Sequence, residues 1–103
     1  MKENKLTMRI QKPVREVFAF TIDPACTPQW IEKIEEEETN EWPPALGSIY
    51  KNKTKSGKLS EYVVTDFTKD HSFELTSRDG NYHVRYAYGE IKPDVTALEY
   101  HNG

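Results

Sequence analysis

The sequence lacks several features that would assign a protein class directly. It contains one cysteine, Cys26, which excludes an intramolecular disulfide and a cysteine-based zinc site. No apolar run approaches the roughly 20 residues that a membrane-spanning helix needs. The first residues, MKENKLTMRI, contain no hydrophobic signal region. We therefore expect a soluble, cytoplasmic protein with no stable membrane insertion.

Positive charge is also scarce, since the formal net charge is -3. A general nucleic-acid binder needs a basic face that releases counterions from phosphates, so we expect no nucleic-acid partner. One local basic cluster exists, formed by Lys51, Lys53, Lys55 and Lys58 around a predicted hairpin. Such a cluster is usually a solvated hairpin tip, and less often the contact to an anionic partner or membrane surface.

Motifs for catalysis or metal binding are absent as well. The histidines His71, His83 and His101 have no metal-ligand spacing such as HExxH. The four glutamates 35–38 have neither the spaced oxygen ligands nor the glycine turn of a calcium loop. No Gly-x-Ser-x-Gly elbow and no phosphate-binding glycine loop occurs. We expect no catalytic residue, no metal and no cofactor.

Aromatic residues are what the sequence has in abundance. They make up 12% of the chain, with six tyrosines, four phenylalanines and two tryptophans, although hydrophobic residues reach only 36%. Each aromatic side chain buries a large area, so a chain of 103 residues can form one core. The length fits one domain, residues 1–103, and not two.

The pattern of apolar residues predicts one strand, two short helices and about six further strands. Alternation predicts the first strand at 5–12, and helical spacing after Pro13 predicts helices at 14–22 and 25–31. Asp23 is placed to cap the turn between them. The acidic segment 32–42 fits neither period well and is predicted as an edge strand, because charge discourages edge pairing. The remaining predicted strands are 48–54, 59–67, 72–77, 82–89 and 95–100.

Short turns join these later strands, and hairpin-joined strands form an antiparallel sheet. Helices segregated to one place on such a sheet define an α+β fold. The expected architecture is a curved antiparallel sheet of six to seven strands, with two short helices between strands one and two.

Four segments of the sequence resemble the START-like superfamily, also called the polyketide cyclase/dehydrase and lipid-transport (SRPBCC) superfamily. They are PVREVFAFTIDPACTPQWI at 13–31, the Leu-Gly-Ser-Ile-Tyr run at 46–50, SEYVVTDF at 60–67 and Thr-Ala-Leu-Glu-Tyr at 96–100. The resemblance implies a helix-grip fold, in which the sheet curls around a long C-terminal helix and an apolar ligand lies between them. Here the sequence ends at Gly103, directly after the last predicted strand, so that helix is expected to be absent.

An uncovered sheet face would leave Phe73, Leu75, Val84, Tyr86, Leu98 and Tyr100 in water. Exposed apolar patches of that size usually mark an interface, so we expect a homodimer that covers the face. Within the sheet, Phe18, Phe20 and Trp30 are expected to close one end as a structural clamp.

The resemblance implies that the protein binds an apolar small molecule or lipid on the concave face, without catalysis. The residues expected to line that site are Trp30, Tyr62, Phe73, Leu75, Val84, Tyr86, Tyr88, Leu98 and Tyr100. Tyrosine suits a pocket because it offers an apolar body and one hydroxyl, but it also simply packs sheets. Glu61 is the candidate for a buried carboxylate if it faces inward. The alternatives are a cyclase- or dehydrase-type enzyme, and a protein-interaction module like the relatives that activate the Hsp90 chaperone.

Overall fold

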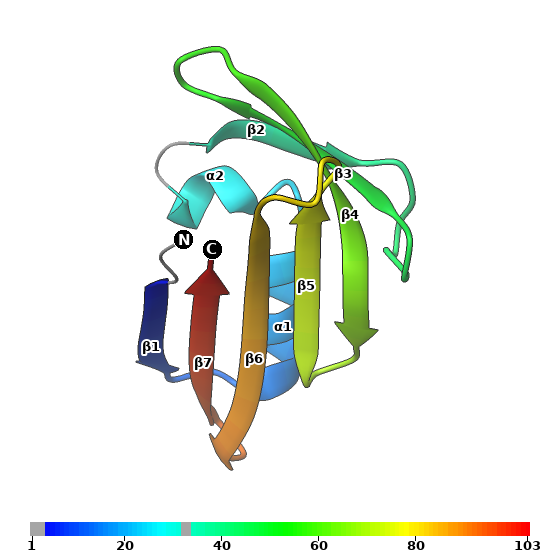
Figure 1. Ribbon diagram of the computed structural model, residues 1–103. Coiled ribbons are helices and arrows are strands. Elements are labelled where there is room, and N and C mark those ends of the chain that lie inside the picture. Colours follow the sequence, from blue (N-terminus) through cyan, green and yellow to red (C-terminus); the bar gives the residue numbers. More distant parts are fainter. Residues whose placement is uncertain (1–3, 32–33) are drawn as a thin grey trace.

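The computed structural model describes residues 4–31 and 34–103. In these ranges the chain forms seven strands and two helices (Figure 1). Their bounds, in chain order, are β1 Asn4–Ile10, α1 Val14–Ile22, α2 Thr27–Trp30, β2 Ile34–Thr39, β3 Ile49–Thr54, β4 Leu59–Thr68, β5 Ser72–Ser77, β6 His83–Lys92 and β7 Val95–Asn102. The predicted α+β fold, with two short helices between the first two strands, is confirmed.

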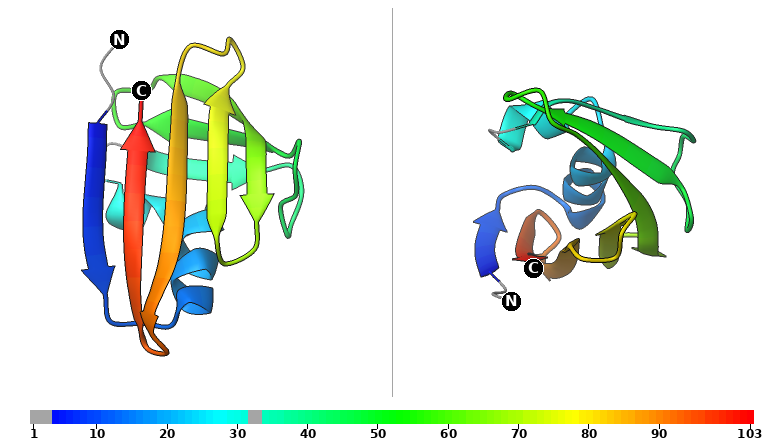
Figure 2. Two further views of the ribbon diagram at one scale, coloured as in Figure 1. Left: turned by 60° about the horizontal axis from the view of Figure 1, so that its bottom comes forward. Right: turned by 45° about the horizontal axis from the view of Figure 1, so that its top comes forward.

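All seven strands belong to one antiparallel sheet in the order β1-β7-β6-β5-β4-β3-β2. Strands β2 to β7 follow one another as hairpins and loops, while β1 pairs with the last strand, so Met8 lies opposite Leu98. The sheet is strongly curled, and β2, β3 and β4 arch over the space in front of β5, β6 and β7. Figure 2 shows α1 lying inside this curl.

Helix α1 begins where Pro13 fixes an extended backbone and ends at Asp23. Its buried residues Val17, Phe18, Thr21 and Ile22 lie on one side, as the helical period requires. The carboxylate of Asp23 accepts a hydrogen bond from the Ala25 backbone N–H at 2.9 Å, which supports the predicted role of Asp23 in the turn between the helices.

The predicted clamp is correct for one of its three residues. Phe18 is buried, with 4% of its surface exposed, but Phe20 is 39% exposed. Phe20 was expected inward because it belongs to an apolar run, yet it lies between the buried positions of the helix. The side chain of Trp30 lies outside the part of the chain that the structure describes.

Two β-bulges decide which side chains face the inside of the curl. In β4 the register shifts between Val64 and Asp66, so Val64 and Phe67 both face inward despite their odd spacing. In β2 the register shifts between Ile34 and Glu36. Ile34 is buried, and the next inward residue is Glu37, which strict alternation from Ile34 would place on the outside.

The core fills the space between α1 and the inner face of the sheet. It consists of Val17, Phe18, Ile22, Tyr50, Val64, Phe73, Leu75, Tyr86, Tyr88 and Leu98. Several of these are residues that we expected to be wet in a single chain: Phe73, Leu75, Tyr86 and Leu98 are only 1 to 7% exposed. That expectation was wrong because α1 and the arched strands cover this part of the face. Val84 remains half-buried.

Strands β1 and β2 are the two edges of the sheet. The prediction that the acidic segment is an edge strand is therefore confirmed, although β2 is shorter than predicted and residues 32 and 33 lie outside the described ranges. The outward residues of β1 include Lys5 and Arg9, whereas those of β2 include Glu36 and Glu38. The two edges thus carry charges of opposite sign.

Candidate functional site

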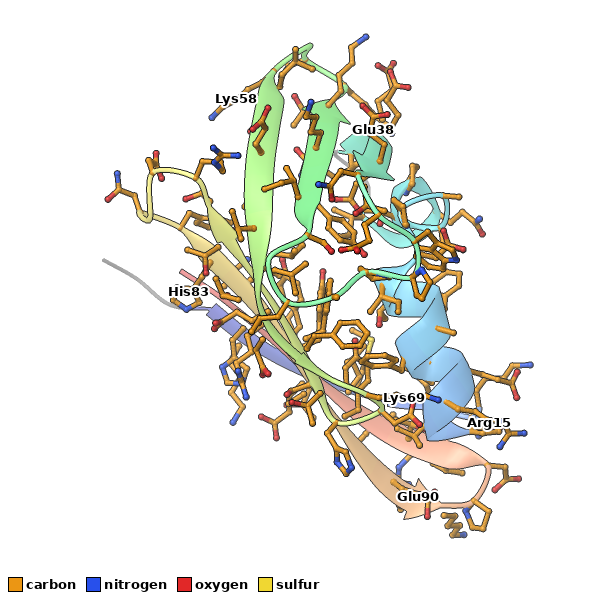
Figure 3. All side chains as sticks on the ribbon, turned by 90° about the vertical axis from the view of Figure 1, so that its right-hand side faces the viewer. Arg15, Glu38, Lys58, Lys69, His83 and Glu90 are labelled. Carbon is orange, nitrogen blue, oxygen red and sulfur yellow. The ribbon has the colours of Figure 1, made fainter. Side chains whose placement is uncertain are left out.

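The inner face of the sheet brings the predicted ligand-binding residues together. All of them except Trp30, whose side chain is not described, lie in or against a single hydrophobic cluster. They come from β4, β5, β6 and β7, which are neighbours in the sheet. Figure 3 shows rings filling the space between sheet and helix, while the charged ends of Arg15, Lys58 and Glu90 lie at the periphery.

One end of this face is closed by α1. The ring of Phe18 packs edge-to-face against Phe67 and Tyr88, with centroids 5.5 and 5.2 Å apart. The hydroxyls of Tyr88 and Thr21 are hydrogen-bonded to each other. Tyr50 donates a hydrogen bond to the backbone carbonyl of Ile22 at 2.6 Å. This end is a packed core in which the tyrosine hydroxyls are hydrogen-bonded.

The other end of the inner face stays partly open. Tyr62, Val84 and Tyr100 are half-buried there, and Tyr82 is 36% exposed. Tyr82 packs edge-to-face on Tyr62 with centroids 6.4 Å apart, and Tyr100 packs on Tyr86 at 5.3 Å. We call this group of Tyr62, Tyr82, Val84 and Tyr100 the open end.

The partly buried carboxyl on the inner side of the sheet belongs to Glu37 and not to Glu61. The side chain of Glu37 is partly buried, and its Oε1 accepts a hydrogen bond from the buried Thr27 hydroxyl at 2.7 Å. The side chain of Asn52, which lies opposite Glu37 on β3, also bonds to it. Burial raises the pKa of the Glu37 carboxyl, and the hydrogen bonds from Thr27 and Asn52 oppose that shift.

Glu61, the predicted buried carboxylate, lies on the outer face of β4. Its side chain is 44% exposed and forms ion pairs with Lys51 at 3.9 Å and Arg78 at 3.4 Å. The prediction was wrong because Tyr62 and Val64 fix the inward positions of this strand, and Glu61 lies between them in the alternation.

Burial raises the pKa of the tyrosines along the inner face. The shift of Tyr62, Tyr86 and Tyr100 is due first to desolvation, and the negative charge of Glu37 adds to it at Tyr62 and Tyr86. These hydroxyls are therefore neutral at physiological pH. The open end offers apolar ring surface and the neutral hydroxyls of Tyr62 and Tyr100, which are the groups of a binding surface for a small, mostly apolar molecule.

A hollow of about 450 Å³ lies over β2, β3 and β4, and its lining includes Glu37 and Asn52. Most of its lining residues alternate with the inward side chains of these strands, and they include Glu36, Glu38, Lys51, Lys53 and Glu61. Lys53 pairs there with Glu35 at 3.5 Å and with Glu36 at 4.0 Å. Its charged lining does not suit an apolar ligand, and the lysines of the predicted basic cluster that lie there are already paired with glutamates.

Among the residues that the structure describes, no group of three or more histidine, cysteine, aspartate or glutamate side chains could hold a metal ion. Nor is any helix in residues 4–31 and 34–103 both long and apolar enough to cross a membrane.

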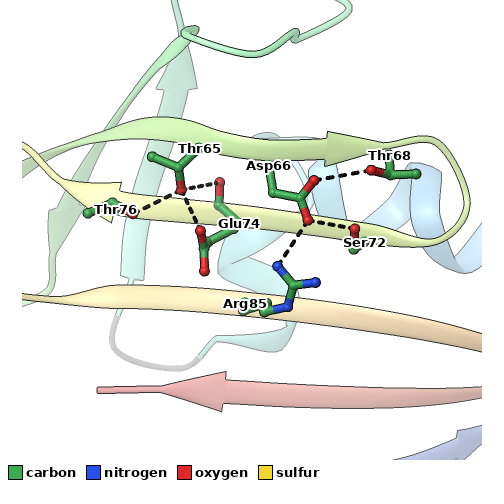
Figure 4. Close-up of polar contacts among 7 residues, drawn as sticks. All are labelled: Thr65, Asp66, Thr68, Ser72, Glu74, Thr76 and Arg85. Atoms are coloured by element: carbon green, nitrogen blue, oxygen red, sulfur yellow. Dashed lines mark hydrogen bonds and ion pairs between the residues drawn. The ribbon is translucent and has the colours of Figure 1, made fainter.

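The outer face carries a polar network that ties three strands together (Figure 4). Asp66, at the β4 bulge, accepts hydrogen bonds from the buried Ser72 at 2.6 Å and from Arg85 at 3.0 Å. The Ser72 hydroxyl is the main cause that lowers the pKa of Asp66, and the charge of Arg85 adds to it. Thr65, which the bulge displaces, bonds to Glu74 at 2.8 Å. This network stabilises the curl and lies on the opposite face of the sheet from the open end.

Comparison with known proteins places the fold. No family model and no curated protein matches the sequence. Solved structures do match: a START superfamily protein from Mycobacterium smegmatis has a TM-score of 0.79 at 14% identity, covering 97% of this chain and 74% of that one. The fold of this chain is therefore START-like, as the sequence resemblance predicted.

Two further structures illustrate how varied proteins of this shape are. Norcoclaurine synthase from Thalictrum flavum, in complex with dopamine and hydroxybenzaldehyde, matches with a TM-score of 0.72 at 9% identity and covers 98% of this chain and 67% of that one. The Aha1 dimer from Colwellia psychrerythraea matches with a TM-score of 0.74 at 10% identity, covering 100% and 76%. At such low identity the likeness concerns the fold alone, because function resides in the site and not in the fold.

Proposed function

We propose that this protein binds an apolar small molecule or lipid at the open end of the inner face, and that it does so without catalysis. The observation that carries the proposal is the contrast between the two ends of one apolar face. The end under α1 is sealed, but Tyr62, Val84 and Tyr100 stay half-exposed although they continue the same core. Aromatic side chains with one convergent polar group are typical of ligand sites.

The non-catalytic reading is supported by the chemistry at the open end. A cyclase or dehydrase needs an acid and a base of separated pKa beside the substrate. Burial raises the pKa of the Tyr62 and Tyr100 hydroxyls and keeps them neutral at physiological pH. This arrangement supports binding better than proton transfer. A cytoplasmic location stays a prediction.

Native mass spectrometry of the protein purified from its own host is the direct test, because it reports a retained ligand and the oligomeric state together. Melting temperatures across a panel of fatty acids, sterols and aromatic compounds complement it. A ligand should raise the melting temperature of wild type and of Thr65→Ala, which alters the exposed outer side of β4. The same ligand should have a smaller effect on Tyr62→Ala. No retained ligand and no shift across the panel would refute the proposal.

A second candidate is association with another copy of the chain, which a separate observation favours. On β1, Leu6 and Met8 lie opposite Tyr100 and Leu98, so they share the inner face. They are 58% and 39% exposed, and they extend the half-buried surface of the open end to the sheet edge. Contiguous apolar surface of this kind marks an interface.

Sedimentation velocity at micromolar concentration tests this association. Wild type should sediment as a dimer, and Leu6→Lys should shift it toward monomer. Thr7→Lys is the matched control, since Thr7 is the next residue on the outer face and should leave the dimer intact. A monomeric wild type would refute the proposed association but would not affect the proposal of small-molecule binding.

A further inference from the structure

Two rows of uncharged side chains cross the inner face of β1, β7 and β6 beside the open end. The strand register gives the first row as Leu6, Tyr100 and Tyr86, and the second row as Met8, Leu98 and Tyr88. The outer face of the same three strands is different, because its corresponding row consists of Lys5, His101 and Arg85. The two faces of this part of the sheet therefore differ sharply in charge.

The exposure of these rows increases toward the edge strand β1. In the first row Tyr86 is buried, Tyr100 is half-buried and Leu6 is 58% exposed. In the second row Leu98 is buried, while Met8 is 39% exposed. Helix α1 packs against β6 and β7, and Figure 1 shows β1 beyond β7 at the sheet edge. Apolar surface thus continues from the open end to the edge of the sheet.

A ligand at the open end of one copy meets rings on one side. Tyr62 packs on Tyr82, and Tyr100 packs on Tyr86, so these rings support one another and form a surface. None of the open-end residues lines the hollow of about 450 Å³ over β2, β3 and β4. Ligand sites normally bury about 70–90% of a small molecule's surface. A second apolar wall is needed to reach that burial.

A second copy of the same face is well suited to supply this wall. In a two-fold symmetric contact, each group lies close to its own symmetry mate. The side chains of Leu6 and Met8 pack favourably on their own kind, and tyrosine hydroxyls both donate and accept hydrogen bonds. A two-fold contact through the outer face would instead place Lys5 and Arg85 near like charges, which is unfavourable.

The size of the inner surface indicates that a ligand would strengthen such a contact. A stable dimer buries roughly 800 Å² per partner from about 20–30 residues a side. The two rows and the open end contain fewer residues than that, so the contact between chains alone should dissociate on dilution. An apolar molecule between the copies adds buried surface on both of them.

We propose that two copies face each other across their open ends and bind the apolar ligand between them, so that ligand binding and dimerisation strengthen each other. This inference rests on the proposed function, because it concerns the same site. It goes further in making the partner copy one wall of that site.

The test uses N-phenyl-1-naphthylamine, an uncharged apolar probe whose fluorescence reports binding. Sedimentation velocity of the full chain gives the dimer dissociation constant with and without the probe. For one site that exists only in the dimer, free probe at ten times its dissociation constant should lower the dimer dissociation constant about tenfold. By reciprocity, the affinity for the probe should rise with protein concentration as monomer gives way to dimer.

Variants on β1 separate the dimer contact from the tyrosine rings. Met8→Lys adds a charge to the second row, outside the open end, and should give a monomer that binds the probe about tenfold more weakly or worse. Thr7→Lys is the matched control, since it adds the same charge at the next residue on the outer face and should behave as wild type. Should Met8→Lys fail to fold, as judged by circular dichroism, Leu6→Lys and the concentration dependence of the wild type decide.

The outcomes distinguish this inference from the proposed function. Equal probe affinity in wild-type dimer and variant monomer, or no change across the monomer-to-dimer transition, overturns the shared site and leaves binding by a single chain standing. A dimeric Met8→Lys, or a wild type that is monomeric with and without the probe, also overturns the inference alone. Absence of binding by the probe and by the lipid panel overturns the proposed function together with the inference.

Discussion

The hydroxyl of Tyr50 allows the contribution of one buried hydrogen bond to the stability of the fold to be tested. Its side chain is 1% exposed, and its hydroxyl donates a hydrogen bond to the Ile22 carbonyl at 2.6 Å. Ile22 is the last residue of α1, and Tyr50 lies on β3, so this bond ties the end of the helix to the arched part of the sheet. We expect Tyr50→Phe to keep the ring packing on Phe73, at 5.7 Å, and to lose only this bond.

The stability that Tyr50→Phe should lose follows from the burial of this hydrogen bond. Removing one partner of a buried hydrogen bond leaves the other unsatisfied, here the Ile22 carbonyl, which costs about 1–3 kcal/mol. For a domain of this size, each kcal/mol lowers the melting temperature by roughly 4–8 °C. We therefore expect Tyr50→Phe to melt about 10 °C below wild type, combining these two ranges.

Tyr62→Phe is the matched control. Tyr62 lies directly opposite Tyr50 in the β3–β4 register, also faces inward, and is only half-buried. Loss of its hydroxyl should cost less than about 0.5 kcal/mol, because water can solvate the group in the native state. Urea unfolding of both variants measures the difference as a shift in midpoint at constant slope. Equal losses in Tyr50→Phe and Tyr62→Phe would refute the reasoning.

Three further predictions concern titrating groups. Ser72→Ala should lose about 1 kcal/mol at pH 7, and the loss should shrink in strong acid, because the lowered pKa of Asp66 stabilises the fold only above its unfolded value near 4. Identical losses at pH 7 and pH 2.5 would contradict this. Glu37 has a raised pKa in the folded state, so wild type should gain stability relative to Glu37→Gln as the pH falls from about 7 to 4; parallel stability curves would exclude it. Burial also raises the pKa of Tyr88, so stability should decline above pH about 10, where unfolded tyrosine ionises first. Tyr88→Phe should flatten that decline, and tyrosinate absorbance that rises before unfolding would argue against it.

The fold was predictable because the alternation of inward and outward residues is visible in the sequence of each strand. The alternation Tyr82, Val84, Tyr86 and Tyr88 identified β6 and placed its tyrosines on one face, as the structure has them. The turns at Gly57 and Gly80 have positive φ values, which suit glycine and fix the hairpins locally. The inward positions of the helix were harder to predict. Phe20 belongs to an apolar run, which suggested burial, but the helical period places it on the outer side of α1.

The polar part of the site was not predictable, for a physical reason. Glu37 stands in a run of glutamates in which every position has the same composition, and the bulge after Ile34 decides which one turns inward. A bulge depends on pairing with β3, so it leaves no mark in the residues of β2 alone. One signal was available: Ile34 is the only apolar residue of β2, and an inward neighbour had to follow it. Counting strictly in twos from Ile34 would have selected the outward Glu36 and Glu38.

The opposite charges of the two sheet edges govern how copies of this protein meet sideways. If two β1 edges paired in antiparallel register, the positive charges of Lys5 and Arg9 would lie opposite each other. If two β2 edges paired, their glutamates would lie opposite glutamates. Each edge therefore repels itself, which protects the open strands from pairing like with like. A β1 edge and a β2 edge attract instead, and that contact is head-to-tail and does not close on itself. Crowded, low-salt solutions are consequently where growth into open chains is favoured, and added salt suppresses it by screening the attraction.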